Sequence, residues 1–234
     1  KLAFHIKAAH AAKKRFRNDT PKRSSANTNL VRSSGSATAR HLDKRLVVIG
    51  SSTGGVEALH TVLPALPPGL PPILVAQHIP AFFSKAVADR LNSVTAYEVR
   101  EATDDEAVLP GQCLVAPGNY HLMVVNSPTG YRTRLVQSPP VHHCRPSVDV
   151  LFRSAAATAG SHTLGVLLTG MGSDGALGMQ AIRQAGGINL SEHEDSCIVY
   201  GMPRAAEHLG VVDQCVMLDD MPQAILDTLA RMSA

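Results

Sequence analysis

The sequence predicts an α/β fold: a doubly wound, mostly parallel sheet with helices on both faces and a β-hairpin excursion. From Arg45 onwards, short apolar runs alternate with segments of helical periodicity, which is typical of chains that build parallel sheets. Several of these runs end in small residues directly before a helical segment. Hydrophobic residues make up 44% of the 234 residues and charged residues 18%, a composition that excludes a disordered chain.

Charge divides the chain near residue 45. Residues 1–45 carry a net charge of +10 and the remainder carries −7. We interpret residues 1–17 as a short helix, 18–44 as a basic flexible linker and 45–234 as the folded domain. The basic segment suits nucleic acid or a membrane surface, but its charges are scattered among Ser, Thr, Asn and Ala, which favours a solubilising linker.

Short runs rich in Val, Ile and Leu predict the strands, in chain order, at residues 46–49, 73–76, 113–116, 164–168, 187–190 and 211–212. Apolar residues at helical spacing predict the helices at residues 56–63, 84–92, 148–159, 175–185, 203–209 and 221–232. Residues 120–136 instead predict two strands around a turn, because Asn, Ser, Pro, Thr and Gly follow one another at residues 126–130.

Several classes of protein are disfavoured. The longest stretch without Lys, Arg, Asp or Glu, residues 58–84, contains six prolines and two histidines, so we expect no membrane span. The start lacks the apolar run of a signal peptide. The four cysteines are far apart with no CxxC pair, which predicts free thiols and a cytoplasmic protein. Trp is absent, which disfavours a stacking surface for single-stranded nucleic acid.

A loop of small residues, 50–55, follows the first predicted strand and precedes a helix. Such a turn exposes the side chain at its tip and directs backbone N–H groups and the positive end of the helix dipole towards it. This geometry serves three uses equally well. It cradles a phosphate, it activates a serine nucleophile and stabilises the oxyanion, or Ser51 or Ser52 simply caps the helix.

His78 and Asp174 complete a possible catalytic set with this loop. His78 follows the second predicted strand, and Asp174 lies in the glycine-rich loop after the strand at residues 164–168. Because the carboxyl ends of parallel strands meet at one edge of a sheet, we expect a serine, a histidine and an aspartate to converge there. That convergence is what a Ser-His-Asp triad requires.

A dinucleotide site is the alternative for the third loop. Residues 170–175 match GxGxxG between a strand and a helix, and the acidic residues expected for ribose binding follow at Glu192, Glu194 and Asp195. However, the Asp174 carboxylate would repel a pyrophosphate, and few residues remain to complete such a domain. We therefore expect no cofactor.

Two weaker patterns remain. Residues 142–144, His-His-Cys, suggest a metal, but adjacent residues rarely point at one ion, so we expect no metal site. Residues 200–203 predict a strand-to-helix turn with Pro203 at the first helical position, and this turn places Met202 near the pocket. Met171 lies close to Asp174 in the sequence, although methionines more often pack than react.

Five motifs in order resemble the catalytic domain of bacterial chemotaxis protein-glutamate methylesterases (CheB type). The resemblance runs from about residue 45 to the C-terminus, and five ordered motifs are more specific than any one alone. The motifs are Ile49-Gly50-Ser51-Ser52-Thr53-Gly54-Gly55, Gln77-His78-Ile79-Pro80, Ala116-Pro117-Gly118, Arg145-Pro146-Ser147-Val148-Asp149 and Leu168-Thr169-Gly170-Met171-Gly172-Ser173-Asp174-Gly175.

This resemblance implies a doubly wound α/β domain that hydrolyses glutamate γ-methyl esters on the signalling helices of chemoreceptors, in chemotaxis adaptation and two-component signal transduction. Some members also deamidate glutamines. The family's nucleophile falls on Ser52, its histidine on His78 and its aspartate on Asp174. We expect the oxyanion to be stabilised by backbone N–H groups around Ser52, Thr53 and Gly54.

The resemblance also bears on partners. It implies chemoreceptors as protein substrates and a phosphorylation-controlled receiver domain on the N-terminal side. Residues 1–17 resemble the last helix of such a receiver, and the basic linker resembles the segment between the two domains. A competing hypothesis is a regulatory binding module in which the basic arm tethers a catalytically silent body.

Overall fold

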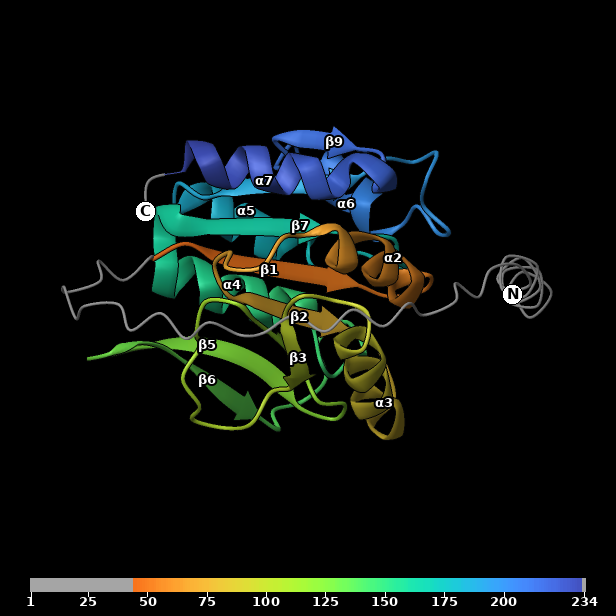
Figure 1. Ribbon diagram of the computed structural model, residues 1–234. Helices are drawn as coiled ribbons and strands as arrows, with labels where there is room; N and C mark the ends of the chain where they lie inside the picture. Colours follow the sequence, from red (N-terminus) through yellow and green to blue (C-terminus); the bar gives the residue numbers. More distant parts are fainter. Residues whose placement is uncertain (1–43, 233–234) are drawn as a thin grey trace, which may run out of the picture. The chain divides into compact units, whose positions relative to one another are not determined.

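A seven-stranded parallel sheet forms the centre of the computed structural model, which describes residues 44–232 (Figure 1). The strand order is β3-β4-β2-β1-β7-β8-β9, and all neighbours pair in parallel. The strands are β1 (Leu46–Ser51), β2 (Ile73–Gln77), β3 (Glu98–Glu101), β4 (Gln112–Val115), β7 (Thr163–Leu167), β8 (Ile188–Glu192) and β9 (Gln214–Val216).

Helices cover both faces of this sheet, as the sequence predicts. One apolar cluster joins the sheet to α2 (Gly55–Val62), α3 (Ala81–Asn92) and α7 (Met221–Arg231). The other cluster joins it to α4 (Val148–Ala159), α5 (Ala176–Gln184) and α6 (Met202–His208). Short 3-10 turns lie at Leu63–Ala65, Gly160–His162 and Leu218–Asp220. The prediction of a doubly wound α/β fold is confirmed.

Strand β1 shows why the sheet is central. All six of its residues are buried, and successive side chains alternate between the two apolar clusters. A strand covered on both faces needs a continuous apolar run, and residues 46–49 supply one. The chain continues from β1 to β2 on one side and reaches β7 on the other side only later. The carboxyl ends of these three strands therefore meet where the direction of winding reverses, which is the usual place for a site in such sheets.

The predicted hairpin is present as a separate two-stranded antiparallel sheet, β5 (His121–Ser127) and β6 (Gly130–Val136). Its turn consists of Pro128 and Thr129, within the stretch that predicts it. The hairpin packs on α4. The amide of Val124 donates to Ser154 Oγ (3.0 Å), and Thr158 Oγ1 donates to the Val124 carbonyl (2.9 Å).

Three elements differ most from the prediction. Strand β3 was not predicted, because three of its four residues are charged and no apolar run marks it. The last strand is β9 rather than residues 211–212. Val211 and Val212 instead pack with the α6 cluster, and the exposed Gln214 and Cys215 pair with β8. Helix α3 begins at Ala81, three residues early, directly after the extended Pro80.

The helix predicted for residues 1–17 and the linker up to residue 43 lie outside the described residues. Among residues 44–232, no helix is both long enough and apolar enough to cross a bilayer.

Candidate active site

Three polar side chains meet at the carboxyl edge of the sheet. Ser52 follows β1, His78 follows β2, and Asp174 lies in the loop between β7 and α5. Ser52 Oγ lies 3.1 Å from His78 Nδ1, and His78 Nε2 lies 2.7 Å from Asp174 Oδ2. The residues that the sequence selects therefore form one continuous hydrogen-bonded chain.

The two adjacent serines have different environments. Ser51 is fully buried, and its Oγ donates to Gln77 Oε1 at 2.6 Å. Gln77 Nε2 in turn donates to the Ser52 carbonyl at 2.9 Å, so Gln77 fixes the backbone of this loop. Only Ser52 turns its hydroxyl towards His78. Ser51 therefore acts as a structural residue and Ser52 is the candidate nucleophile.

The backbone after Ser52 supplies the candidate oxyanion donors. The Ser52 amide already donates to the Thr169 carbonyl (3.0 Å). Among the described residues, the amides of Thr53 and Gly54 have no acceptor. Gly54 has φ +84°, and a Cβ there would lie 2.6 Å from Ile198 Cβ, so glycine is required. The structure narrows the predicted donors to Thr53 and Gly54.

The ring nitrogen of His78 that donates is identified by its partner. Burial alone would raise the pKa of Asp174, but hydrogen bonds from His78 and from the amides of Asp149 and Val148 outweigh it and lower the pKa. Because Asp174 is ionised, His78 Nε2 carries the proton and donates to it. His78 Nδ1 is then free to accept the Ser52 hydroxyl proton, which is the role of a general base.

A cradle of donors surrounds Asp174. Ser147 Oγ donates to Oδ1 (2.8 Å), the Val148 amide to Oδ2 (2.8 Å) and the Asp149 amide to Oδ1 (2.9 Å). Val148 and Asp149 begin α4, so the positive end of that helix dipole also faces the carboxylate. Residues 147–149, part of a motif that the sequence marked only through the resemblance, therefore hold the Asp174 carboxylate.

Cys144 is a neighbour that sequence reasoning missed. Its Sγ lies 3.4 Å from His78 Nδ1, the nitrogen that also faces Ser52. Burial and then the charge of Asp174 raise the pKa of the thiol, so it is neutral. No spacing signal predicts this contact. Together with His78, Cys144 lines a cavity of about 220 Å³, whose other residues are Ile79, His143, Arg145 and Pro146.

The histidines and cysteine at residues 142–144 do not converge on one point. His142 Nε2 lies 2.9 Å from Asp149 Oδ2, whereas Cys144 contacts His78. Among the described residues, His142, Asp149 and Asp174 bring ligand atoms within 4.8 Å of one another. The carboxylate oxygens of this group already accept hydrogen bonds from the protein, so the group is explained without an ion.

The glycine-rich loop does not resemble a dinucleotide cradle in its contacts. Asp174 points inward to His78 and the start of α4. Glu192 is fully buried, and its Oε2 accepts the Thr169 amide at 2.8 Å. A ribose therefore cannot reach it, which removes one of the residues on which that alternative depended.

The two methionines differ in exposure. Met171 is 58% exposed on the loop that carries Asp174. Met202 is fully buried. A Cβ on Gly170 would meet Met202 Sδ and would lie 2.7 Å from Ser52 Cβ, so Met202 packs beneath the site. Of the two, only Met171 is available to contact a bound molecule.

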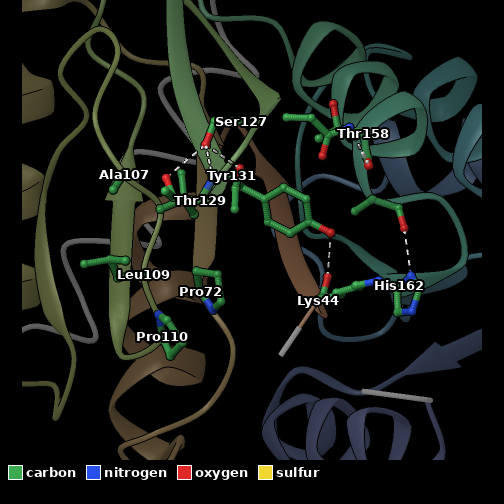
Figure 2. A pocket seen from close by; sticks show the side chains of 14 residues that line it. Lys44, Pro72, Ala107, Leu109, Pro110, Ser127, Thr129, Tyr131, Thr158 and His162 are labelled. Carbon is green, nitrogen blue, oxygen red and sulfur yellow. Dashed lines mark hydrogen bonds between the residues drawn. The ribbon is translucent and has the colours of Figure 1, made fainter. Parts of the chain in front are cut away.

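A larger pocket of about 470 Å³ lies at the opposite, amino edge of the sheet (Figure 2). Lys44, Pro72, Pro110 and His162, which precede β1, β2, β4 and β7, are among its lining residues. Tyr131 points across it and donates its hydroxyl to the Lys44 carbonyl (2.8 Å). The lining contains no serine paired with a base, so the pocket lacks the chemistry of the carboxyl edge.

Comparisons with known proteins identify the family of the chain. A sequence model of a family described as CheB methylesterase matches residues 47–225. "Protein-glutamate methylesterase/protein-glutamine glutaminase 2" of Syntrophus aciditrophicus is 49% identical over 188 residues, which cover 80% of this chain and 54% of the relative. The similarly named protein of Thiobacillus denitrificans is 47% identical over 187 residues, covering 80% and 52%. The chain spans about half the length of the curated relatives it matches.

A comparison with solved structures shows that the fold, too, is similar to that of a CheB methylesterase. The crystal structure of the Thermotoga maritima CheB methylesterase catalytic domain superposes with a TM-score of 0.77 at 38% sequence identity. The match covers 78% of this chain and 97% of that one.

Proposed function

Because the chain belongs to the CheB methylesterase family, we propose that it hydrolyses γ-methyl esters of protein glutamates with Ser52 as nucleophile. The observation that carries the proposal is the continuous chain from Ser52 Oγ through His78 to Asp174. Family membership is compatible with a silent binding module, whereas a hydroxyl aligned with a base and an ionised carboxylate favours an enzyme.

The proposed reaction has two halves. Ser52 Oγ attacks the ester carbonyl as His78 Nδ1 takes its proton, and Asp174 stabilises the imidazolium. The oxyanion is placed near the amides of Thr53 and Gly54. The imidazolium then protonates the departing methoxide oxygen, so that methanol leaves and an acyl-enzyme remains. His78 next takes a proton from water, the hydroxide attacks the acyl carbonyl, and Ser52 recovers the proton as the glutamate carboxylate is released.

We also propose glutamine deamidation by the same residues. The same attack on a glutamine side chain expels ammonia and leaves an identical acyl-enzyme. The names of the relatives include glutaminase as well as methylesterase. The two activities therefore share every residue of the triad and differ only in the leaving group.

Chemoreceptor signalling helices are the substrates we propose, with a role in chemotaxis adaptation. A helix presents its glutamate beside apolar side chains, and Phe82 (94% exposed), Phe83 and Met171 offer exposed apolar surface on segments that follow β2 and β7. We also propose a receiver domain as a partner and a cytoplasmic location. The free thiols of Cys113, Cys144, Cys197 and Cys215 suit a reducing compartment.

Methanol release from a methyl-esterified chemoreceptor signalling fragment tests the proposal. We expect Ser52→Ala to lower kcat by about 10⁶-fold, because no other group replaces the nucleophile. Ser51→Ala is the matched comparison and should lose far less, since its hydroxyl only orients Gln77. A folded Ser52→Ala protein that retains turnover would contradict the assignment. Receptor binding without hydrolysis by either protein would favour the binding module.

A further inference from the structure

Asp149 is a buried carboxylate that the proposed mechanism does not use. It lies in the first turn of α4 and is 1% exposed. Its backbone amide contacts the triad aspartate, but its side chain points to other groups. A carboxylate buried away from water is costly unless it is paired and hydrogen-bonded, so the groups that bind the Asp149 side chain must offset its burial.

The partners of Asp149 are at the start of the next helix. Its Oδ1 accepts the amides of Gly175 (2.9 Å) and Gly178 (2.7 Å), which lie at and just inside the N-terminus of α5. Its Oδ2 lies 2.9 Å from His142 Nε2, and Arg153 Nη2 lies 4.0 Å away. The carboxylate therefore occupies the N-terminus of a helix to which it does not belong.

Each of the two carboxylates is bound by the N-terminus of the other helix. Asp174 immediately precedes Gly175, the N-cap of α5, yet its side chain is bound by the first amides of α4. Asp149 belongs to α4, yet its side chain is bound by the first amides of α5. Each helix N-terminus thus holds the acid supplied by the other, which fixes the two ends against each other.

Two glycines make the exchange sterically feasible. Gly175 has φ +97°, and a Cβ there would lie 2.7 Å from Leu167 Cδ1 and 2.8 Å from Val148 Cγ1. A Cβ on Gly178 would lie 2.5 Å from Phe152 Cβ. Real Cβ atoms do not approach this closely, so both positions require the missing side chain. The amides reach Asp149 only because the helices approach at these glycines.

We propose that Asp149 is a positioning residue that acts on catalysis through Asp174. Asp149 binds the amide of Gly175, the residue joined to Asp174, and so sets the position of the carboxylate that orients His78. Removing it leaves two amides without an acceptor and releases the start of α5. A displacement of about 1 Å in a positioning group costs about 100-fold in rate. This inference rests on the proposed function for its activity readout.

Asp149→Ala and Asp149→Asn test the proposal, with Asp220→Ala as the matched control. Asp220 is the N-cap of α7 and makes no side-chain capping bond. We expect Asp149→Ala to lower kcat for methanol release by about 10- to 100-fold with KM within about twofold. Asp149→Asn should recover most of the rate, because its amide oxygen still accepts both N–H groups. Asp220→Ala should leave kcat unchanged.

Measuring the effect of Asp149→Ala in an Asp174→Asn protein separates a positioning role of Asp149 from a merely structural one. If Asp149 acts through Asp174, Asp149→Ala should reduce the residual rate of the Asp174→Asn protein by less than about twofold. A full multiplicative loss in that background would overturn the proposal. Equal rates in wild type and folded Asp149→Ala would overturn it as well.

A spectroscopic readout keeps the inference separate from the proposed function. The proton between His78 Nε2 and Asp174 should give a low-field NMR resonance that disappears in Asp174→Asn. In Asp149→Ala it should shift or broaden, and in Asp149→Asn it should recover. An unshifted resonance in Asp149→Ala contradicts the inference, even if the wild type hydrolyses no receptor ester. If Asp149→Ala fails to fold, Asp149→Ser replaces it, because its shorter side chain cannot reach both the Gly175 and Gly178 amides. Its His78 resonance must then shift from wild type, whereas that of Asp220→Ala must not.

Discussion

The two edges of the central sheet differ in what their histidines contact. At the carboxyl edge, His78 connects a hydroxyl to an ionised carboxylate beside a cavity of about 220 Å³. At the amino edge, His162 lines a pocket of about 470 Å³, and within residues 44–232 its ring nitrogen contacts only the Ala159 carbonyl (3.1 Å). Cavity size is therefore a poorer guide to function than the convergence of groups with different charges.

The direction of the chain explains the difference. Strands β1, β2 and β7 each lead into a helix, so helix N-termini and their N–H groups gather at the carboxyl edge. The helices end at the amino edge, where apolar side chains such as Leu109 and Pro110 line the pocket together with polar ones such as Thr158. The same sheet thus has one edge suited to anions and oxyanions and one edge without that bias.

Substituting one histidine at each edge tests the comparison most severely. We expect His78→Gln to lower kcat by about 10⁴-fold or more, because the general base is lost. His162→Gln should change kcat by less than about twofold. Methanol release measures both, and circular dichroism checks that both proteins fold. A comparable loss in the two variants would contradict the division between the edges.

Substituting one exposed apolar residue at each edge should have a smaller effect, on KM rather than on kcat. Phe82, near the candidate site, is 94% exposed, and Leu109, at the amino pocket, is 50% exposed. If Phe82 contacts the substrate helix, Phe82→Ala should raise KM by about three- to tenfold, or roughly 1 kcal/mol, without changing kcat. Leu109→Ala should leave both constants unchanged. Equal KM values for Phe82→Ala and wild type would exclude Phe82 from the substrate contact.

The smallest expected effect is on the pH dependence of the free energy of unfolding. It distinguishes Glu192 from Asp174, two buried acids near the carboxyl edge. Burial raises the pKa of Glu192, against the opposing hydrogen bond from the Thr169 amide, and Glu192 Oε1 has no partner among the described residues. Above the usual glutamate pKa of about 4.3, the unfolded chain loses this proton before the folded one does. The free energy of unfolding therefore falls as pH rises from there to the raised pKa.

Urea unfolding between pH 4 and pH 8 measures this dependence. Glu192→Gln should remove the decline, since an amide does not titrate. The lowered pKa of Asp174 has the opposite sign, so its contribution to stability is present at neutral pH and is lost as pH falls below the usual aspartate range. A Glu192→Gln protein with the wild-type decline would show that another group causes it.

The sequence predicts the fold, His78 and Asp174 from local signals, whereas the choice of Ser52 over Ser51 rests on the family resemblance. Buried strands such as β1 are continuous apolar runs, Ser52 and His78 directly follow strands, and Asp174 lies in the loop between β7 and α5. Strand β3 was missed because its pairing with β4 stabilises a charged segment without an apolar run.

The remaining contacts of the site depend on packing. No spacing rule brings Cys144 to His78 across 66 residues or crosses Asp149 with Asp174. The contacts of Asp149 and Asp174 follow from the approach of α4 and α5, which the glycines at residues 175 and 178 permit. The sequence marks those glycines but does not show what they face.

The central place of β1 also has a consequence for how the domain is made. Strand β1 ends at Ser51, and its neighbour β7 begins only at Thr163. At about 5–20 residues per second, a ribosome needs roughly ten seconds to synthesise the chain between them. During that interval the edge of β1 that later pairs with β7 has no partner strand, so its backbone N–H and C=O groups on that side are unpaired. Pairing between strands that are far apart in the sequence slows folding. Ser52 and His78 are therefore synthesised well before Asp174 can contact His78.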